Sequence, residues 1–236
     1  MPPINDDRVV RLALDVNVFI ADILSRRQKR RNTATIRIVD AVRNGICQAG
    51  PVQLITSVPI IETFANVLQR RLGYDAYIAE ERAWILEEYT RQGPMQSQPH
   101  VTVGAGYIPF ATEAEMRQSI ESHLKRKDID KLFHEIQDDR QDDRQDDRYV
   151  LETAIAGNAD ILVTSNIGDF CRDPAIKLQR ADVVLYPFAN RTLVIATPQI
   201  TSYWLDQGII PDAEFIAEHP DDFAQYAPPS KKPGET

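Results

Sequence analysis

Short apolar runs recur along the chain and predict buried strands. Residues 9–14 and 52–56 form two such runs, each bounded by polar residues. Residues 159–165 form a third run, which is almost continuously apolar, rich in β-branched side chains and preceded by a helical pattern. Continuous runs of this kind are typical of strands buried on both faces of a parallel sheet. Residues 181–187 and 192–198 are the later strand candidates.

Between the strands, apolar residues recur three and four positions apart, which predicts helices. Gly45 is a suitable stop for the helix expected at residues 33–44, and Ser57 is a suitable N-cap for the helix expected at residues 57–72. Strands that alternate with helices predict an α/β fold with a central, mostly parallel sheet covered on both faces. The expected helices include residues 33–44, 57–72, 74–91 and 198–207.

The middle of the chain interrupts this alternation. Residues 95–136 begin with a stretch rich in Gln, Gly and Pro, so we expect a helical and loop insertion within a domain that spans residues 8–206. A further helix is expected to contain the threefold Gln-Asp-Asp-Arg repeat at residues 137–148 and to end near Gly157. Residues 207–236 are expected to form a C-terminal extension that ends in a disordered tail.

The composition is that of an ordinary soluble globular protein, with 236 residues, 43% of them hydrophobic, and a net charge of −8. No apolar segment is long enough to cross a bilayer, and the N-terminus has no signal-peptide core. The two cysteines lie in no metal-binding spacing. We therefore expect a cytoplasmic protein without a membrane partner.

The negative charge argues against a protein that coats nucleic acid by bulk electrostatics. It does not exclude a nuclease, because a metal site built from carboxylates adds negative charge where a polyanion is cut. Binding would then depend on local basic residues, for which a solvated surface is the alternative interpretation. The candidates lie in one segment and are Arg26, Arg27, Lys29, Arg30 and Arg31.

Acidic side chains stand at or just beyond the predicted strand ends. Asp15 ends the first strand, and Glu62 lies in the first turns of the helix after the second strand, among apolar neighbours that place it near a buried face. The turn after the third strand offers Ser165, Asn166 and Asp169. Taken singly, each could be ordinary turn or helix-end chemistry. Together they indicate one site, because the working groups of parallel sheets gather at the carboxyl ends of the strands.

The Gln-Asp-Asp-Arg repeat raises the question of how many of its carboxylates can take part. Four residues advance a helix by about 6 Å, so equivalent aspartates form a slanted ridge that one ion cannot span. Asp147 is the best placed, because it lies one turn before Val150 and Leu151 on the face expected to pack on the sheet. Asp146 is the fallback. The rest of the repeat is expected to be a solvated spacer.

The chain resembles the PIN-domain family, and in particular the toxins of bacterial toxin–antitoxin pairs (VapC-like ribonucleases). The likeness rests on "LALDVNVFI", "SVPIIETFANVL", "DDRYVLETAIAGNADILVTSNIGDF" and "LVIATPQI". It implies a three-layer α/β/α fold in which Asp15 is the first metal-binding aspartate, Glu62 the helical glutamate and Asp147 the third acidic residue. The fourth position falls on Asn166 or Asp169, because an asparagine stands where many members have aspartate.

The residue chemistry and the resemblance together predict a metal-dependent endoribonuclease. Carboxylate oxygens without clustered imidazole or thiolate ligands suit Mg²⁺ or Mn²⁺ rather than zinc. Thr164 or Ser165 could donate a hydrogen bond to a phosphate or to the metal-binding carboxylates. The expected metal ligands are Asp15, Glu62, Asp147 and Asp169, and the expected catalytic set adds Asn166.

The resemblance also implies partners, namely an RNA substrate, a cognate antitoxin protein and a second copy of the chain in a homodimer or higher oligomer. Three other functions stay open. One is a PIN fold kept as a binding or regulatory module with weak catalysis or none, and another is a related DNA nuclease. The third is a phosphatase, although that class usually carries Asp-x-Asp at the first strand, where this chain has Asp15 and Asn17.

Overall fold

A seven-stranded sheet forms the centre of the computed structural model, which describes residues 8–94, 145–171, 175–177, 182–188 and 191–219. Within these residues the order of the strands across the sheet is β2-β3-β1-β4-β7-β6-β5. The strands are β1 (Val10–Leu14), β2 (Ile46–Cys47), β3 (Gly50–Ile55), β4 (Ile161–Val163), β5 (Ile176–Lys177), β6 (Val183–Phe188) and β7 (Arg191–Ala196).

The four central strands are parallel and carry the site. β1 pairs in parallel with β3 on one side and with β4 on the other, and β4 pairs in parallel with β7. Antiparallel strands complete the two edges: β2 pairs with β3 at one edge, and at the other β6 pairs with β7 and β5 with β6. Leu12 of β1 and Ile161 of β4 are fully buried, as expected for strands covered on both faces. The predicted α/β class with a mostly parallel central sheet is confirmed.

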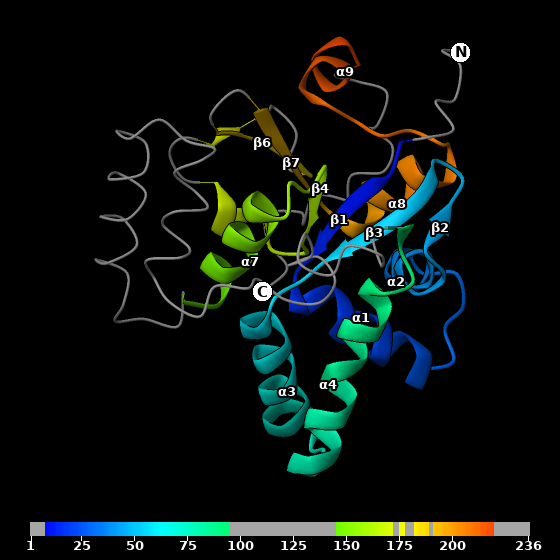
Figure 1. Cartoon of the computed structure of the whole chain (residues 1–236), viewed down its shortest axis with the longest axis vertical. Coiled ribbons are helices and arrows are strands. Elements are labelled where there is room, and N and C mark those ends of the chain that lie inside the picture. Colours follow the sequence, from blue (N-terminus) through cyan, green and yellow to red (C-terminus); the bar gives the residue numbers. More distant parts are fainter. Residues whose placement is uncertain (1–7, 95–144, 172–174, 178–181, 189–190, 220–236) are drawn as a thin grey trace, which may run out of the picture.

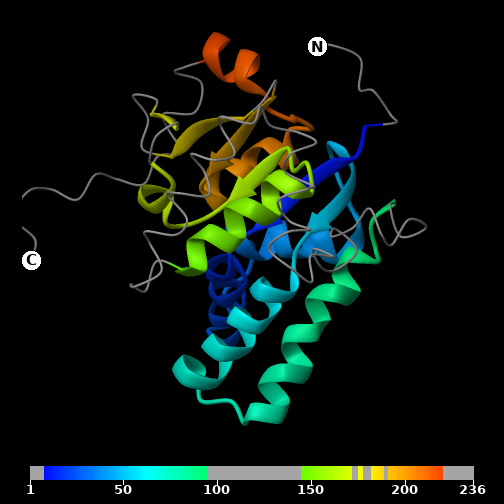
Figure 2. The same cartoon turned by 60° about the vertical axis from the view of Figure 1, so that its left-hand side comes forward.

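Helices cover both faces of this sheet, which gives the three-layer arrangement that the resemblance implied. α2 and α8 contact each other and the sheet on one face, and α7 packs on the other face against β1 and β4 (Figures 1 and 2). The helices are α1 (Val16–Arg27), α2 (Ala34–Asn44), α3 (Val58–Leu72), α4 (Ala76–Thr90), α7 (Gln145–Ala156), α8 (Pro198–Asp206) and α9 (Ala213–Glu218), with a short 3-10 helix, η2 (Ile167–Phe170).

Local sequence explains where several helices begin and end. Thr33 caps α2 by accepting a hydrogen bond from the backbone N–H of Ile36, and Gly45 ends the helix in the left-handed conformation, as predicted. Ser57 occupies the N-cap position of α3, but its side chain makes no capping hydrogen bond. Ser57 is thus the N-cap residue as predicted, but its hydroxyl accepts a hydrogen bond of 2.8 Å from Thr153 of α7 and joins two helices.

Two helices begin directly at the carboxyl ends of central strands. α1 follows β1 at Val16, and α3 follows β3 after Thr56 and Ser57. α3 and α4 then form a hairpin that projects away from this edge of the sheet, and α1 lies beside it (Figure 1). The carboxyl edge of the sheet and the beginnings of α1 and α3 therefore share one region of the molecule.

Some predicted segments lie outside the described residues. These are the expected insertion at 95–136, the first part of the Gln-Asp-Asp-Arg repeat and the disordered tail expected at the end of the C-terminal extension. Within the expected C-terminal extension, the structure places α9, which the sequence analysis did not predict, with Asp212 as its N-cap. No helix of the part described here is long and apolar enough to cross a membrane.

Candidate functional site

Asp15 lies at the carboxyl end of β1, where it is the N-cap of α1. Its backbone N–H continues the β1–β4 pairing by donating to the carbonyl of Val163, which fixes the turn against the next strand. Only 6% of Asp15 is exposed. A carboxylate this deeply buried costs folding free energy unless hydrogen bonds or a cation compensate its charge.

Three hydrogen bonds hold the Asp15 carboxylate. Thr164, which follows β4, donates its hydroxyl to Oδ2 at 2.6 Å. Asn17 donates its side-chain amide to the same oxygen at 2.6 Å and its backbone N–H to Oδ1 at 3.3 Å. The predicted hydrogen bond from Thr164 or Ser165 to a carboxylate is thus present in the structure and comes from Thr164.

Asn17 ties the two strand ends together, a role that the sequence analysis did not assign to it. Its side-chain carbonyl accepts a hydrogen bond of 3.0 Å from the backbone N–H of Ser165, and its amide also contacts Thr164 Oγ1 at 3.1 Å. The available signal was the Asp-x-Asn spacing directly after a strand, where such side chains bond to nearby backbone groups. The carboxyl ends of β1 and β4 therefore form one connected polar cluster.

The electrostatics of Asp15 are unfavourable in the protein alone. Burial is the largest influence and raises the pKa of its carboxyl above the ordinary value. Hydrogen bonds from Thr164 and from the backbone of Asn17 and Val16 oppose this rise in pKa, and the negative charge of Asp169 adds to it. A bound cation would relieve both the desolvation of Asp15 and its repulsion by Asp169.

Asp169 is the second carboxylate of this cluster. It lies in η2, directly after the turn that follows β4, and is half-buried. Asn166 is exposed and donates its side-chain amide to Asp169 Oδ2, while its backbone N–H donates to Thr164 Oγ1 at 3.0 Å. The structure therefore places a charged oxygen of Asp169 within electrostatic reach of Asp15, and it places Asn166 as the residue that orients Asp169.

Glu62 is exposed, contrary to the expectation that it lies near a buried face. Its neighbours Ile60, Ile61 and Phe64 are buried as predicted, and Phe64 packs against Phe19 of α1 with ring centroids 5.6 Å apart. Glu62 projects from the other side of α3, because successive helical residues point about 100° apart. It forms no ion pair with another described residue.

The backbone of Asp147 lies in the first turns of α7, whereas its side chain lies outside the part of the chain that the structure describes. Two hydrogen bonds of 2.8 Å join Arg11 in β1 to Asp160, which follows α7, so the end of α7 lies near the start of β1. α7 contacts β1 and β4, and because β4 follows its end and is parallel to β1, the chain reverses direction between α7 and these strands. A helix of 12 residues rises about 18 Å, which carries its first turn towards the carboxyl edge of the sheet.

The donor atoms at this edge fit a hard divalent cation. Asp15 and Asp169 offer carboxylate oxygens and pair with no cationic side chain among the described residues. Over those same residues, no three His, Cys, Asp or Glu side chains gather closely enough to hold an ion. A complete ligand set therefore needs a further donor. The resemblance implied Asp147 and Glu62 for this role, and α3, which carries Glu62, begins at this edge.

The predicted basic segment does not adjoin Asp15. It lies at the opposite end of α1, which at 12 residues is about 18 Å long. Arg26 is engaged in ion pairs, at 2.8 Å with Asp22 and 2.7 Å with Asp40. Arg27 lies over the ring of Tyr74, 4.8 Å from its centroid. The remaining members of the segment, Lys29, Arg30 and Arg31, are exposed.

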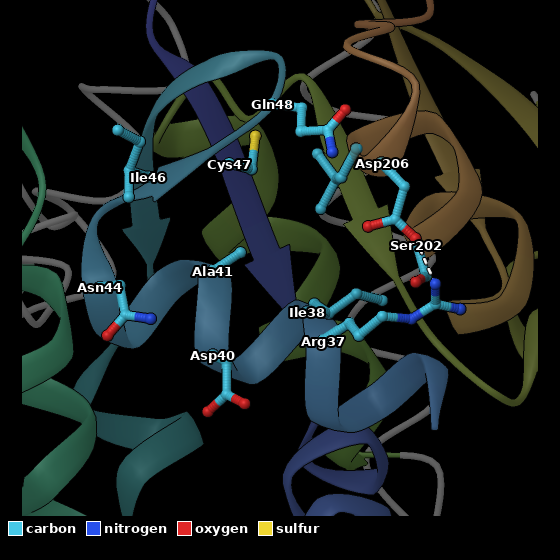
Figure 3. A pocket seen from close by; sticks show the side chains of 11 residues that line it. Arg37, Ile38, Asp40, Ala41, Asn44, Ile46, Cys47, Gln48, Ser202 and Asp206 are labelled. Carbon is cyan, nitrogen blue, oxygen red and sulfur yellow. Dashed lines mark hydrogen bonds and ion pairs between the residues drawn. The ribbon is translucent and has the colours of Figure 1, made fainter. Parts of the chain in front are cut away.

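A separate hollow of about 240 Å³ lies between α2, β2 and α8, as Figure 3 shows. Arg37 and Asp206 form an ion pair within it, and Asp40 is paired with Arg26. Each of its charged groups thus has an ion-pair partner, so the hollow lacks a carboxylate without a cationic partner, which Asp15 is among the described residues. We therefore assign the candidate site to the carboxyl edge of the sheet.

Comparison with known proteins identifies one family. A family model described as "PIN domain" matches residues 11–168, which is well over half of the chain. The matched span includes Asp15, Glu62, Asp147 and Asn166 and ends one residue before Asp169. No curated protein and no solved structure matches the chain.

Proposed function

The chain belongs to the PIN domain family, and from this premise we propose that it is a Mg²⁺- or Mn²⁺-dependent endoribonuclease that acts as the toxin of a toxin–antitoxin pair. PIN domains are in general metal-dependent nucleases. The observation that carries the proposal is the buried Asp15 carboxylate, whose charge is compensated by hydrogen bonds but by no cationic side chain of the described residues, while the negative charge of Asp169 adds to the rise in its pKa.

Asp15 and Asp169 would hold the ion, with Asp147 and Glu62 as the further ligands that the family likeness implies. Oxygen donors of this kind favour Mg²⁺ or Mn²⁺ over softer metals. When bound, such an ion supplies Lewis-acid activation of water and neutralises charge that develops on a phosphodiester. The donor set favours a hydrolytic reaction over one that uses a covalent protein nucleophile.

The residues around Asp15 would keep its carboxylate fixed and unprotonated for this task. Thr164 and Asn17 each donate a hydrogen bond of 2.6 Å to Oδ2, which restricts rotation of the group and favours its charged form. Asn166 would orient Asp169 in the same way through its side-chain amide. We therefore propose Asp169 as the ligand at the fourth position and Asn166 as its positioning residue.

The proposed reaction is tested with the purified full chain, labelled single-stranded RNA and DNA, and Mg²⁺, Mn²⁺ or EDTA. We expect cleavage of RNA that requires the ion and that falls at least about 100-fold in Asp15→Asn and in Asp169→Asn. Asp212→Asn is the matched control, because Asp212 is also a helix N-cap but belongs to α9. Cleavage in EDTA, or unchanged cleavage by Asp15→Asn, would overturn the proposal. If the chain cleaves DNA and not RNA, its substrate is DNA and the proposed ribonuclease activity is wrong.

The toxin role rests on the resemblance and needs a test of its own. Expression of the wild-type chain is expected to arrest growth of a bacterial host, whereas Asp15→Asn expressed at the same level is expected to be harmless. A short neighbouring gene whose product restores growth and binds the chain would supply the antitoxin. Equal growth under both chains would contradict the toxin role and leave the nuclease activity to be judged by the cleavage assay.

A further inference from the structure

Basic and aromatic side chains lie at the far end of α1, at the far end of α3 and at the start of α4, and Tyr74, between α3 and α4, contacts Arg27 of α1 and Arg82 of α4. We call this region the distal tip, and it lies at the end of these helices that points away from the sheet (Figure 1). Its cationic members come from three separate segments, which are the end of α1 with the residues after it, the last turn of α3 and the second turn of α4. The distal tip comprises Arg27, Lys29, Arg30, Arg31, Arg70, Arg71, Tyr74, Tyr77 and Arg82.

Tyr74 brings these segments together. The guanidinium groups of Arg27 and Arg82 lie 4.8 and 4.9 Å from the centroid of its ring. Arg82 also donates a hydrogen bond of 3.5 Å to the Tyr74 hydroxyl. Contacts of this kind hold cations above an aromatic face without neutralising their charge. Two positively charged groups from different helices are thus fixed beside one ring.

The other cations of the distal tip are exposed and lack carboxylate partners. Lys29, Arg30 and Arg31, and likewise Arg70 and Arg71, form no ion pair with any other residue of the described ranges. The exposed acids nearest to the tip in sequence are Asp75, Glu80 and Glu81, so the cations outnumber them. The charge here is opposite to that of the whole chain, which is −8. An anion is therefore attracted to the distal tip.

The start of α4 also carries an exposed aromatic side chain, three residues after Tyr74. Tyr77, in the first turn of α4, is 74% exposed and is the most exposed of the large hydrophobic residues described. A positive surface next to a free aromatic ring suits single-stranded nucleic acid, because phosphates bind the cations and unstacked bases stack on the ring. A duplex offers no free base face, and an acidic peptide would make no use of Tyr77.

We propose that the distal tip holds the backbone of single-stranded RNA and that Tyr77 stacks on one of its bases. The proposal rests on the ribonuclease function and extends it, because it identifies a second contact on the substrate about 18 Å from Asp15, the length of α1. At a rise of about 3.4 Å per nucleotide in a helical strand, that separation corresponds to about five nucleotides. The distal tip would therefore set a minimum length for efficiently bound substrate.

The binding test uses the full chain in EDTA, so that RNA stays intact, and measures the fluorescence anisotropy of a labelled 20-nucleotide single strand against salt concentration. Removal of two phosphate contacts in Arg30→Ala/Arg31→Ala or Arg70→Ala/Arg71→Ala is expected to weaken binding about 10- to 30-fold at 0.1 M salt. The slope of log K against log salt should fall by about 1.4. Tyr77→Ala should weaken binding about 5-fold or more and leave the slope unchanged.

Arg8→Ala/Arg191→Ala is the control, because it removes the same charge from two exposed residues outside the distal tip: Arg8, which precedes β1 and pairs with Asp160 at 3.5 Å, and Arg191, which begins β7. It is expected to leave affinity within about 3-fold of the wild type. Equal losses in the control and the tip variants would overturn the proposal, since bulk charge would then explain them. Unchanged RNA binding by the tip variants, together with weaker binding of a polyglutamate peptide, would reassign the surface to an acidic protein.

This test separates the distal tip from the function on which it rests. Asp15→Asn is expected to bind the same RNA with the affinity of the wild type while it fails to cleave in Mg²⁺. If tip variants bind and cleave like the wild type, the distal tip has no role and the ribonuclease function stands. If no chain, wild type included, binds or cleaves RNA, the ribonuclease function fails as well.

Discussion

Substitution of Asp15 gives the sharpest test of the metal site, because it can be followed without any substrate. Asp15→Asn removes the charge but keeps an oxygen that can accept from Thr164 and Asn17, as Asp15 does at 2.6 Å from each. The variant should therefore fold, and in EDTA it should unfold at the same temperature as the wild type or above it. The reason is that the buried charge, which raises the pKa of Asp15, is gone.

The difference should appear when metal is added. An ion present at 100 times its dissociation constant stabilises the folded wild type by about 2.7 kcal/mol. For a chain of this size, each 1 kcal/mol moves the melting temperature by about 2–4 °C, so we expect a rise of about 5–11 °C. If loss of this ligand weakens the binding of the ion by about 100-fold, the same ion concentration stabilises Asp15→Asn by about 0.4 kcal/mol, which raises the melting temperature by about 1–2 °C.

The assay is thermal unfolding followed by circular dichroism, with titration of MnCl₂ or MgCl₂ from an EDTA baseline. Asp212→Asn serves as the control and should show the full metal-dependent rise, because Asp212 caps α9 through a bond to Phe215 and has no part in the site. Equal rises for Asp15→Asn and the wild type would refute the reasoning, since the ion would then bind elsewhere.

Three further predictions follow from particular contacts. In EDTA, Asp15→Asn should have a higher free energy of unfolding than the wild type at pH 7. This excess should shrink as pH falls through the raised pKa of Asp15, because the folded wild type then binds the proton that relieves its buried charge. Urea unfolding at pH 7 and pH 4.5 measures the excess, and a constant value would contradict the prediction. Arg26→Ala should destabilise the fold by about 1–2 kcal/mol in urea unfolding, because it leaves the largely buried Asp22 without its partner. It should nevertheless weaken RNA binding less than Arg30→Ala/Arg31→Ala does. A larger loss of RNA affinity in Arg26→Ala than in Arg30→Ala/Arg31→Ala would show that Arg26 contacts the substrate. Gly157→Ala should lower the free energy of unfolding by about 1–3 kcal/mol, because the added Cβ would lie 2.2 Å from Cγ2 of Ile55. Gly168→Ala should leave stability nearly unchanged, because the added Cβ would meet no atom within 4 Å. Equal melting temperatures for the two variants would contradict this packing.

The strands and most helices could be predicted because their signals are local. The apolar runs ending at Leu14 and Val163 were recognisable as strands since both faces of a central strand must be buried. α9 was missed because six residues carry too little periodicity to indicate a helix. β2 and β5 are two-residue edge strands whose pairing partners, rather than their own sequence, define them.

The sequence alone determined which residue types were available for chemistry, that Asp15 would stand at a strand end and that Asp169 would follow the end of another strand. The tertiary structure decided which of them meet. Thr164 is 149 positions from Asp15, and only the parallel pairing of β1 with β4 brings its hydroxyl to the carboxylate. Likewise, the basic segment lies far from Asp15, although only a dozen residues separate them, because the two stand at opposite ends of α1. Periodicity reports the burial of each segment, whereas the distance between segments depends on strand order and helix direction, which no local pattern specifies.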